Sequence, residues 1–515
     1  MTNQDDVITF LHSVFSGRIG FPTVIKTHVS IVFLAGDTAY KMKKAVKFPF
    51  LDFTSLAARK IACEKEIKIN KRTAPTIYKR VVAVTSEPEG LALDGPGEPV
   101  EYLVEMDRFD ETTVFDQLIT PPGKLRRKLM EALADEIATF HMAADVKLTS
   151  GGCEGTRKIA ENNKQSFDVL PSDVFENDSV QSVTRKTLDR IDNAELHLTK
   201  RQKNGHVRVC HGDLHLRNIC LVDGQPTMFD AIEFSDDFSD IDTMYDLAFL
   251  LMDLDFRGER RLASLVLNRY LDVLTEDVDT FHVLPIFLSM RAQIRAHVGA
   301  AAASAQSEPD KIQSELDAAR QYLSLAATYL SSSPARLVAV GGLSGSGKSR
   351  LAREIAPFFS QGVGARVLRS DVERKRLSAV HPNKSLGVEG YTPEMTKKTL
   401  DHLFQMAKDV LETGQSVVLD AVFASPALRS AAEQIAKELG IEFQGIWVDA
   451  SDEIRLARIQ KRQNNVSDVT PEIALQQSNY DLGEMNWIKV DSSGEKHKTV
   501  KSAQTVLSKV FMELQ

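Results

Sequence analysis

Residues 211–218 read His-Gly-Asp-Leu-His-Leu-Arg-Asn, and a short apolar run downstream ends at Asp230. Phosphoryl transfer requires a carboxylate that orients and deprotonates the attacking hydroxyl, together with oxygen ligands that hold magnesium against the phosphates. Asp213 suits the first task, while the amide of Asn218 and the carboxylate of Asp230 suit the second. The alternative is a loop whose Asp and Asn only cap turns, but the complete pattern favours a phosphate-transfer site.

An Asp-Gly pair at 223–224 separates two short strands expected at 219–222 and 227–229. Such a pair is typical of a two-residue hairpin turn, because both positions tolerate a left-handed backbone. The returning strand therefore brings Asp230 back beside Asn218, and the two candidate magnesium ligands are expected to lie together.

This stretch resembles two groups of kinases. Its spacing equals H-R-D-L-x-x-x-N, the catalytic loop of protein kinases, with Gly212 in the place of the arginine. The variant H-G-D-x-H-x-x-N is the signature of aminoglycoside phosphotransferase-like kinases. The resemblance implies an α+β bilobal, protein-kinase-like domain over residues 1–330, with an N-lobe over about 1–105 and a helical C-lobe over about 110–330. The site residues that it implies are the base Asp213, the Mg²⁺ ligands Asn218 and Asp230, and His215, which orders the loop.

The N-lobe of such a kinase begins with a hairpin whose second strand carries a lysine for the nucleotide phosphates. A hairpin is expected over 27–43, with its first strand beginning at Thr27, and period-two alternation puts Lys41 and Lys43 on one face. The resemblance favours Lys41, with Lys43 as the fallback and a solvated strand edge as the alternative for both. No G-x-G-x-x-G precedes them, so Thr27 and Ser30 would offer hydroxyl and backbone N–H groups instead.

A charged helix is expected over 54–72, beginning at a Thr/Ser cap. In a kinase-like lobe this helix supplies a glutamate that pairs with the strand lysine. Glu66 is the stronger candidate, and Glu64 is expected to face solvent. The hinge between the lobes, where backbone groups bind an adenine edge, is expected near 105–107.

Six acidic residues follow the hairpin, between positions 233 and 246. One interpretation is an anionic wall that selects a cationic acceptor such as an aminosugar. The favoured interpretation is a solvated loop in which Asp242 and Asp246 cap the next helix and brace the catalytic loop.

A second, unrelated pattern follows the polar break Ser-Ser-Ser-Pro at 331–334, which predicts a linker at 331–336 and a second domain at 337–515. A buried strand at 337–341 runs into G-L-S-G-S-G-K-S at 342–349, a complete Walker A sequence. Its backbone N–H groups and the following helix N-terminus cradle phosphates, its lysine reaches the β- and γ-phosphates, and its last serine ligates Mg²⁺. The residues assigned to nucleotide binding are Gly342, Ser344, Gly345, Ser346, Gly347, Lys348 and Ser349, with Lys348 also catalytic and Ser349 also a metal ligand.

The next strand ends at Asp371, where residues 371–374 give D-x-x-R. This resembles the small kinases of the polynucleotide-kinase, gluconate-kinase, chloramphenicol-phosphotransferase and zeta-toxin type. The resemblance implies that Asp371 activates an acceptor hydroxyl while Arg374 steadies the substrate; a helix N-cap is the alternative role for Asp371. A buried strand at 416–420 ends in Asp420, which suits the holding of a magnesium-bound water.

The last pattern is a lid. A helix beginning at Asp452 carries Arg458 and Arg462 at a spacing of i, i+4, so both lie on one face. In adenylate-kinase-like enzymes lid arginines neutralise the charge that moves with the γ-phosphate; a solvated helix face is the alternative. The strands that follow the Walker A sequence predict an α/β P-loop kinase domain with a five-stranded parallel sheet and helices on both faces.

The composition limits the class of protein. The 515 residues suit two or three domains, and 43% hydrophobic with 26% charged residues describes a soluble globular protein. A net charge of −8 disfavours nucleic acid as a partner. Four cysteines without metal-ligand spacing suit a reducing compartment, and neither a signal peptide nor a membrane-spanning run is found. A cytoplasmic protein without a membrane partner is therefore expected, and the sequence specifies no oligomeric state.

The combined patterns predict an ATP- and Mg²⁺-dependent phosphotransferase with two kinase sites that act on a small-molecule hydroxyl acceptor, such as a sugar or aminosugar. The fusion resembles bacterial proteins described as bifunctional aminoglycoside phosphotransferase/ATP-binding proteins. Two alternatives stay open. In one, a nucleotide-binding domain regulates a single catalytic domain; in the other, the chain contains a toxin-like kinase that acts on a nucleotide sugar or a nucleic-acid end.

Overall fold

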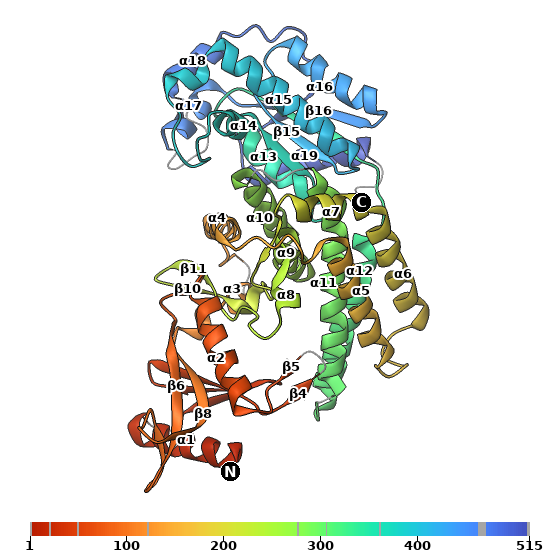
Figure 1. Cartoon of the computed structure of the whole chain (residues 1–515). Helices are drawn as coiled ribbons and strands as arrows, with labels where there is room; N and C mark the ends of the chain where they lie inside the picture. Colours follow the sequence, from red (N-terminus) through yellow and green to blue (C-terminus); the bar gives the residue numbers. More distant parts are fainter. Residues whose placement is uncertain are drawn as a thin grey trace. The chain divides into compact units, whose positions relative to one another are not determined.

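A computed structural model divides the chain into two compact units (Figure 1). One unit is Met1–Thr156 with Arg201–Leu250, and the other is Arg157–Lys200 with Leu251–Gln515. The predicted linker at 331–336 falls inside the second unit, and the predicted domain boundaries stay a prediction. The residues that the structure describes are 3–19, 22–48, 51–120, 123–274, 278–304, 306–359, 362–461 and 470–511.

A six-stranded antiparallel sheet forms the N-terminal part of the first unit. Alternation along its strands sends Phe33 and Met42 into a core shared with Phe15 of the first helix. The opposite face carries Lys41 and Lys43, which both reach one glutamate of helix α2. The elements are α1 (Gln4–Ile19), β1 (Thr23–Lys26), β2 (Ser30–Ala35), β3 (Thr38–Lys43), α2 (Leu56–Asn70), β6 (Tyr78–Glu87), β7 (Gly90–Leu93) and β8 (Glu98–Asp107), with strand order β1-β2-β3-β8-β6-β7.

The expectation that the first strand of the hairpin begins at Thr27 is wrong. The N–H of Thr27 donates to the carbonyl of Ser30 at 2.9 Å, and the N–H of Ser30 donates to Thr27 Oγ1 at 2.9 Å. These residues form a tight turn between β1 and β2. Both N–H groups are used inside that turn, so they are not presented to a phosphate as expected.

The catalytic-loop region of the first unit consists of short strands and helices. The hairpin predicted at 223–224 is confirmed, because Asp223 and Gly224 have φ values of 51° and 75° and Ile219 pairs with Met228 across the two strands. The elements are α4 (Arg127–Ala143), β9 (Val207–Val209), β10 (Ile219–Val222), β11 (Gln225–Met228), α8 (Asp236–Ser239), β12 (Asp240–Asp242) and α9 (Thr243–Phe256), of which α9 extends into the second unit.

Long helices make up the first part of the second unit, and α11 packs closely against α12 (Figure 1). The helical C-lobe predicted for this part of the chain is seen as three helices in the described residues between 260 and 329. Within the described ranges, no helix combines the length and the apolarity needed to cross a bilayer. The helices are α6 (Asn177–Asn193), α10 (Arg260–Val273), α11 (Asp279–Ser304) and α12 (Pro309–Tyr329), together with α5 (Gly152–Asp168) and α7 (Glu195–Lys203), which begin or end in the first unit.

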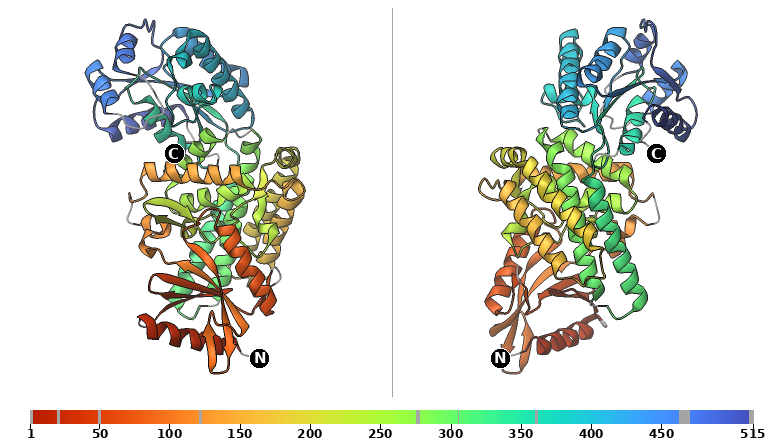
Figure 2. Two further views of the ribbon diagram at one scale, coloured as in Figure 1. Left: turned by 60° about the vertical axis from the view of Figure 1, so that its left-hand side comes forward. Right: turned by 90° about the vertical axis from the view of Figure 1, so that its right-hand side faces the viewer.

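The predicted five-stranded parallel sheet is confirmed, with strand order β14-β15-β13-β16-β17. Parallel strands need crossover connections, and these place α13 and α19 on one face and α15 and α16 on the other, as Figure 2 shows. The strands are β13 (Arg336–Gly341), β14 (Arg366–Arg369), β15 (Val417–Asp420), β16 (Glu442–Asp449) and β17 (Ile488–Asp491), and the helices are α13 (Lys348–Ile355), α14 (Ser370–Leu377), α15 (Pro393–Glu412), α16 (Pro426–Leu439), α17 (Asp452–Gln460), α18 (Pro471–Ser478) and α19 (Lys496–Val510).

Helix α10 covers the edge strand β14. Asn268 Oδ1 accepts from the N–H of Val367 at 2.7 Å, and Asn268 Nδ2 donates to the carbonyl of Ala365 at 3.1 Å. The amide thus takes the place of a neighbouring strand at an edge that would otherwise be open. Beside it, Arg366 Nη1 pairs with Asp272 Oδ1 at 2.8 Å, and both side chains are buried. The parallel sheet therefore depends on α10, a helix that precedes all five of its strands in the chain.

Replacement of Asp272 by alanine should destabilise the second unit by about 3 kcal/mol, because it leaves the buried Arg366 guanidinium without its carboxylate. Urea unfolding followed by tryptophan fluorescence measures this, since Trp447 and Trp487 both lie in the sheet region. The control is Asp317→Ala, which removes an exposed pair with Arg320 and should change stability by less than about 0.5 kcal/mol. Equal shifts for the two variants would contradict the prediction.

Candidate active sites

Lys41 lies between two carboxylates in the first unit. Its Nζ atom is 2.7 Å from Glu66 Oε1 and 2.6 Å from Asp230 Oδ1. Burial alone would lower the pKa of Lys41, but Asp230 and Glu66 outweigh it and hold the pKa well above its ordinary value. Burial would likewise raise the pKa of Glu66, yet Lys41 and Lys43 lower it to about 2. Lys41 and Glu66 are therefore both ionised at neutral pH. Glu64, the weaker candidate, is more than half exposed and lies beside Lys60.

The predicted base and the predicted amide ligand are in contact. Asn218 Nδ2 donates to Asp213 Oδ2 at 2.8 Å and to the Asp213 carbonyl at 2.9 Å. With its NH₂ group committed to Asp213, the amide oxygen of Asn218 is the atom left to bind a cation. His215 Nε2 lies 3.4 Å from Asp213 Oδ2, and its ring meets Phe249 edge-on. These contacts favour the predicted role of His215 in ordering the loop.

Steric constraints explain why position 212 is a glycine. Gly212 has a φ of 84°, and a Cβ atom there would lie 2.7 Å from the carbonyl oxygen of Phe238. A side chain such as the arginine of the protein-kinase loop does not fit this backbone. The departure from the protein-kinase pattern is thus built into the local packing.

The backbone of Asp230 is held in an unusual conformation by residues that the motif did not reveal. Its φ is 60°, in the left-handed region, and its N–H donates to Tyr78 Oη at 3.1 Å. The next N–H, of Ala231, donates to Asn70 Oδ1 at 2.8 Å. Tyr78 begins β6 and Asn70 ends α2, so two distant elements fix the direction of the Asp230 side chain. The left-handed backbone of Asp230 is the sign that these contacts hold it, and that conformation is visible in the structure but not in the sequence.

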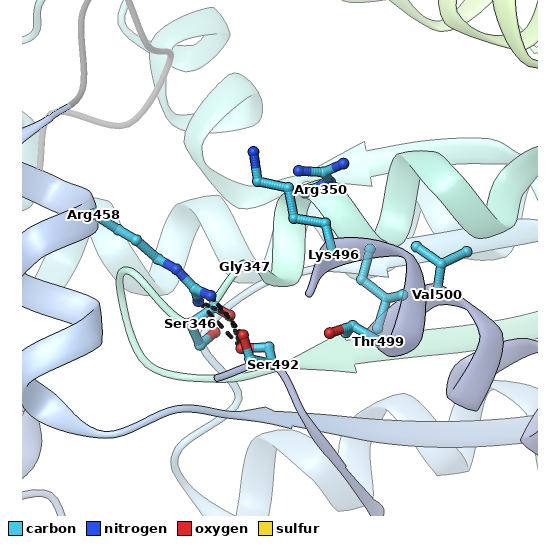
Figure 3. Close-up of a pocket in the computed structure, with 9 residues that line it drawn as sticks. Ser346, Gly347, Arg350, Arg458, Ser492, Lys496, Thr499 and Val500 are labelled. Carbon is cyan, nitrogen blue, oxygen red and sulfur yellow. Dashed lines mark hydrogen bonds between the residues drawn. The ribbon is translucent and has the colours of Figure 1, made fainter. Parts of the chain in front are cut away.

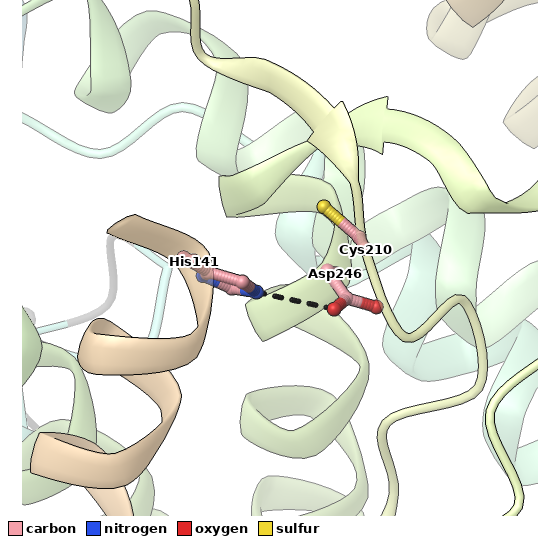
Figure 4. A group of neighbouring side chains, drawn as sticks. All are labelled: His141, Cys210 and Asp246. Atoms are coloured by element: carbon pink, nitrogen blue, oxygen red, sulfur yellow. Dashed lines mark hydrogen bonds and ion pairs between the residues drawn. The ribbon is translucent and has the colours of Figure 1, made fainter. Parts of the chain in front are cut away.

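Asp246 braces the catalytic loop, as the favoured interpretation of the acidic run predicted. Its Oδ1 accepts from the N–H of Gly212 at 2.8 Å, and its Oδ2 accepts from the N–H of His211 at 3.0 Å. His141 Nε2 lies 3.1 Å from the same Oδ2 atom, and Cys210 completes a fully buried group (Figure 4). Two backbone donors therefore use the carboxylate, which explains a buried acid here without a metal ion.

The other acids of this run also have partners, and the run is less solvated than expected. Asp242 is buried against Arg201, with two oxygen–nitrogen distances of 2.8 Å. Asp240 pairs with Lys147, and Asp236 pairs with Lys65. Asp240 and Asp242 are therefore buried and paired with basic residues, which favours the bracing interpretation for them, while Asp236 and Asp237 are exposed.

The phosphate-binding loop of the second unit is held from outside by arginines. Arg455 Nε donates to the carbonyl of Ser344 at 2.9 Å. Arg458 Nη1 donates to the carbonyl of Ser346 at 3.1 Å (Figure 3). Because the C=O and the next N–H of a trans peptide point in opposite directions, the N–H groups of Gly345 and Gly347 are turned to the inner side of the loop. The loop is thereby shaped to receive an anion. Arg462 lies outside the described residues.

A cavity of about 170 Å³ adjoins this loop (Figure 3). Leu351 and Val500 give it an apolar wall, and Arg350, Arg458 and Lys496 supply positive charge. The cavity thus has an apolar wall with cations beside the loop, and it is smaller than a typical ligand pocket.

The remaining predicted residues of this site lie at the carboxyl ends of neighbouring strands. Lys348 and Ser349 begin α13, and Asp371 lies in the first turn of α14, so the alternative role of Asp371 as an N-cap is wrong. Asp420 ends β15 opposite Val340, and its Oδ1 atom is buried and accepts no hydrogen bond from the described residues. An oxygen in that state fits the predicted role in magnesium binding.

Arg374, which was predicted to contact the substrate, is buried. Its Nη1 atom donates to the carbonyl of Gly390 at 2.9 Å and to Thr396 Oγ1 at 3.1 Å, and its guanidinium lies over the Tyr391 ring. Sequence reasoning also missed Gln477, whose Oε1 atom accepts from the N–H of Ser344 at 2.8 Å. Neither the contact of Gln477 nor those of Arg374 belong to a recognisable sequence motif, so the sequence does not predict them.

Comparisons with known proteins find similarities to both parts of the chain. Residues 84–281 match the model of the phosphotransferase enzyme family, and residues 337–482 match that of an AAA domain. An uncharacterized protein of Mycobacterium tuberculosis is 30% identical over 494 residues, which cover 94% of this chain and 95% of that protein. Among solved structures, a choline/ethanolamine kinase family protein from Mesorhizobium loti has a TM-score of 0.38 and 12% identity over 62% of this chain and 98% of its own. The aminoglycoside phosphotransferase APH(3'')-Id from Streptomyces rimosus has a TM-score of 0.36 and 17% identity over 57% of this chain and 99% of its own.

The two folds, the two sites and the family matches define an ATP-dependent kinase, with an α+β phosphotransferase part followed by an α/β P-loop part. The chain belongs to the same family as the mycobacterial protein and joins a phosphotransferase enzyme family domain to an AAA domain. The phosphotransferase match begins at residue 84, so the functions of Lys41 and Glu66 rest on their geometry.

Replacement of Gly345 by alanine should abolish nucleotide binding at the P-loop. Its φ is 88°, and a Cβ atom there would lie 2.6 Å from the carbonyl oxygen of Arg455, so the loop must move. Titration of the full chain with a fluorescent ATP analogue should show one fewer binding site. The control is Gly299→Ala in α11, where a Cβ atom has ordinary contacts and binding should not change. An unchanged stoichiometry for Gly345→Ala would contradict this account of the loop.

Proposed function

We propose that this protein transfers the γ-phosphate of ATP at two separate sites to hydroxyl groups of a small metabolite, such as a sugar or aminosugar. The observation that carries the proposal is the cluster in the first unit, where Lys41, Glu66 and Asp230 form one ion-pair group and Asp213 is bonded to Asn218. The Walker A loop supports a second site of the same reaction type. An ATP-dependent reaction and cysteines without metal-ligand spacing support a cytoplasmic location.

In the first site, Asp213 accepts the proton of the acceptor hydroxyl. The hydrogen bond from Asn218 holds Asp213 Oδ2 and so orients the carboxylate of the base. Lys41 contacts the phosphates of ATP, and Glu66 holds Lys41 in place. Asn218 and Asp230 supply the oxygen ligands for Mg²⁺, which neutralises charge on the transferred phosphate when bound.

In the second site, the loop from Gly342 to Gly347 binds phosphates through the N–H groups of Gly345 and Gly347 and through the N-terminus of α13. The N–H groups of Gly342, Ser344 and Ser346 donate to Val422, Gln477 and Leu343 instead. Lys348 reaches the β- and γ-phosphates, and Ser349 and Asp420 hold Mg²⁺ or its water. Asp371 accepts the acceptor proton, and Arg374 acts on the substrate indirectly, by holding the segment around Gly390 and Thr396. Arg458 supports the loop from its outer side through the carbonyl of Ser346, so the predicted role in neutralising charge during transfer stays with Arg462.

A second candidate function is regulation of one domain by nucleotide bound to the other. The contact of α10 with β14 favours it, because Asn268 and Asp272 hold the strand that leads to Asp371. Under this alternative, Lys348→Ala changes phosphate transfer by the first site. Under the two-site proposal, Lys348→Ala removes one of two separable activities and leaves the other unchanged.

A pool of small metabolites incubated with labelled ATP, Mg²⁺ and the full chain tests the proposal. Asp213→Asn and Asp371→Asn should each lower phosphate transfer to one acceptor by about 10²- to 10⁴-fold, the usual contribution of a general base. Chelation of Mg²⁺ should abolish both activities. The matched control is Asp317→Asn on the exposed face of α12, which should transfer phosphate at the unchanged rate. Full activity of both base variants on every accepted metabolite would refute the assignment of bases.

A further inference from the structure

Five charged side chains form one alternating chain in the first unit. Asp230 and Glu66 flank Lys41, and Lys43 Nζ lies 2.6 Å from the other oxygen of Glu66, Oε2. Lys43 Nζ also pairs with Glu233 Oε1. The order is therefore Asp230, Lys41, Glu66, Lys43, Glu233, with the sign of charge changing at each step.

The half of this chain that contains Lys43 is buried. The side-chain exposures of Lys43, Glu66 and Glu233 are 1%, 0% and 6%. An exposed ion pair contributes little, but a buried charge that loses its partner is strongly unfavourable. Burial would lower the pKa of Lys43, yet Glu233 and Glu66 raise it above its ordinary value. Lys43 is thus a buried cation that depends on two carboxylates.

Three elements contribute to the chain of charges with matching spacing. Lys41 and Lys43 are two residues apart on one face of β3, Asp230 and Glu233 are three residues apart after β11, and Glu66 comes from α2. Two side chains of the segment after β11, Asp230 and Glu233, therefore form ion pairs with β3. Each oxygen of Glu66 serves one lysine, so the position of Glu66 depends on the balance between the two.

We infer that Lys43 and Glu233 are positioning residues for the nucleotide site. The ion pair with Glu233 partly neutralises Lys43, so Lys43 attracts Glu66 less strongly. Glu66 therefore stays beside Lys41. Lys41 then stays between Glu66 and Asp230, where the phosphates of ATP would meet it. The inference deepens the proposed function of the first site, and it rests on the assignment of Lys41 and Asp230 to ATP and Mg²⁺.

The charges predict how each substitution acts. Glu233→Gln leaves Lys43 with Glu66 as its acid partner, so Glu66 is pulled towards Lys43. Lys43→Met leaves the buried carboxylate of Glu233 uncompensated, and the segment that carries Asp230 must shift to solvate it. The double variant Lys43→Met/Glu233→Gln removes one charge of each sign and returns Glu66 to Lys41 alone. Lys43→Arg keeps a cation that can serve both carboxylates.

The experiment uses the full chain with Lys348→Ala, so that mant-ATP with Mg²⁺ reports the first site. Glu233→Gln and Lys43→Met should each weaken mant-ATP binding by about tenfold, in the range of couplings between contacting charged residues. The double variant should bind within about threefold of the parent, and Lys43→Arg should bind similarly. Lys65→Met, which removes an exposed pair with Asp236, is the matched control and should leave the affinity unchanged.

Rescue by the double variant shows that the two charges act on binding through each other. Urea unfolding of each variant separates positioning from a structural role, because a positioning residue weakens mant-ATP binding in protein that stays folded. Unchanged affinity in both single variants, or a double variant as weak as the singles, would overturn the inference. Lys41→Ala and Asp230→Asn serve as references: if they weaken binding and the Lys43 and Glu233 variants do not, only the inference fails. If they leave binding unchanged, the proposed function of this site fails. Where a single variant does not fold, the double variant and Lys43→Arg decide the outcome.

Discussion

The ion pairs of Lys41 are the constraint on which the first site depends. A largely buried ammonium such as that of Lys41 is stabilised by carboxylates around it, since an isolated charge in the interior costs several kcal/mol. Lys41 comes from β3, Glu66 from α2 and Asp230 from the segment after β11, so one charge is satisfied only when three elements are in place. The arrangement places the Lys41 ammonium next to the Asp230 carboxylate. A phosphotransferase needs a cation for the phosphates of ATP and a carboxylate for magnesium.

The second site is organised differently, by the backbone. Its loop offers N–H groups on the inside because Arg455 and Arg458 bind its carbonyls on the outside. Fixed peptide dipoles need no counter-charge, so this loop can be preorganised before a phosphate arrives. The edge of its sheet is completed by Asn268 and Asp272 of α10, which makes that helix a part of the P-loop fold.

Local patterns predicted much of this fold. The Asp-Gly turn, the strand that carries Lys41 and the five parallel strands depend on residues that are neighbours in the sequence, and the structure has them. The turn at Thr27 was missed because a side-chain hydroxyl competes there with strand pairing, which alternation does not register. The contacts of Tyr78 and Asn70 with the backbone around Asp230 were also missed, since they join segments more than 150 residues apart.

By itself, the sequence determined the class of chemistry. The spacing of Asp213, Asn218 and Asp230 and the glycine pattern before Lys348 are short-range features that only phosphate transfer explains well. The tertiary structure alone decided which of two lysines lies beside Asp230, that Lys43 pairs with Glu233, and that most of the acidic run is committed to internal partners. The physical reason is that the strength of a charge interaction depends on distance and burial, and both are set by how distant segments pack.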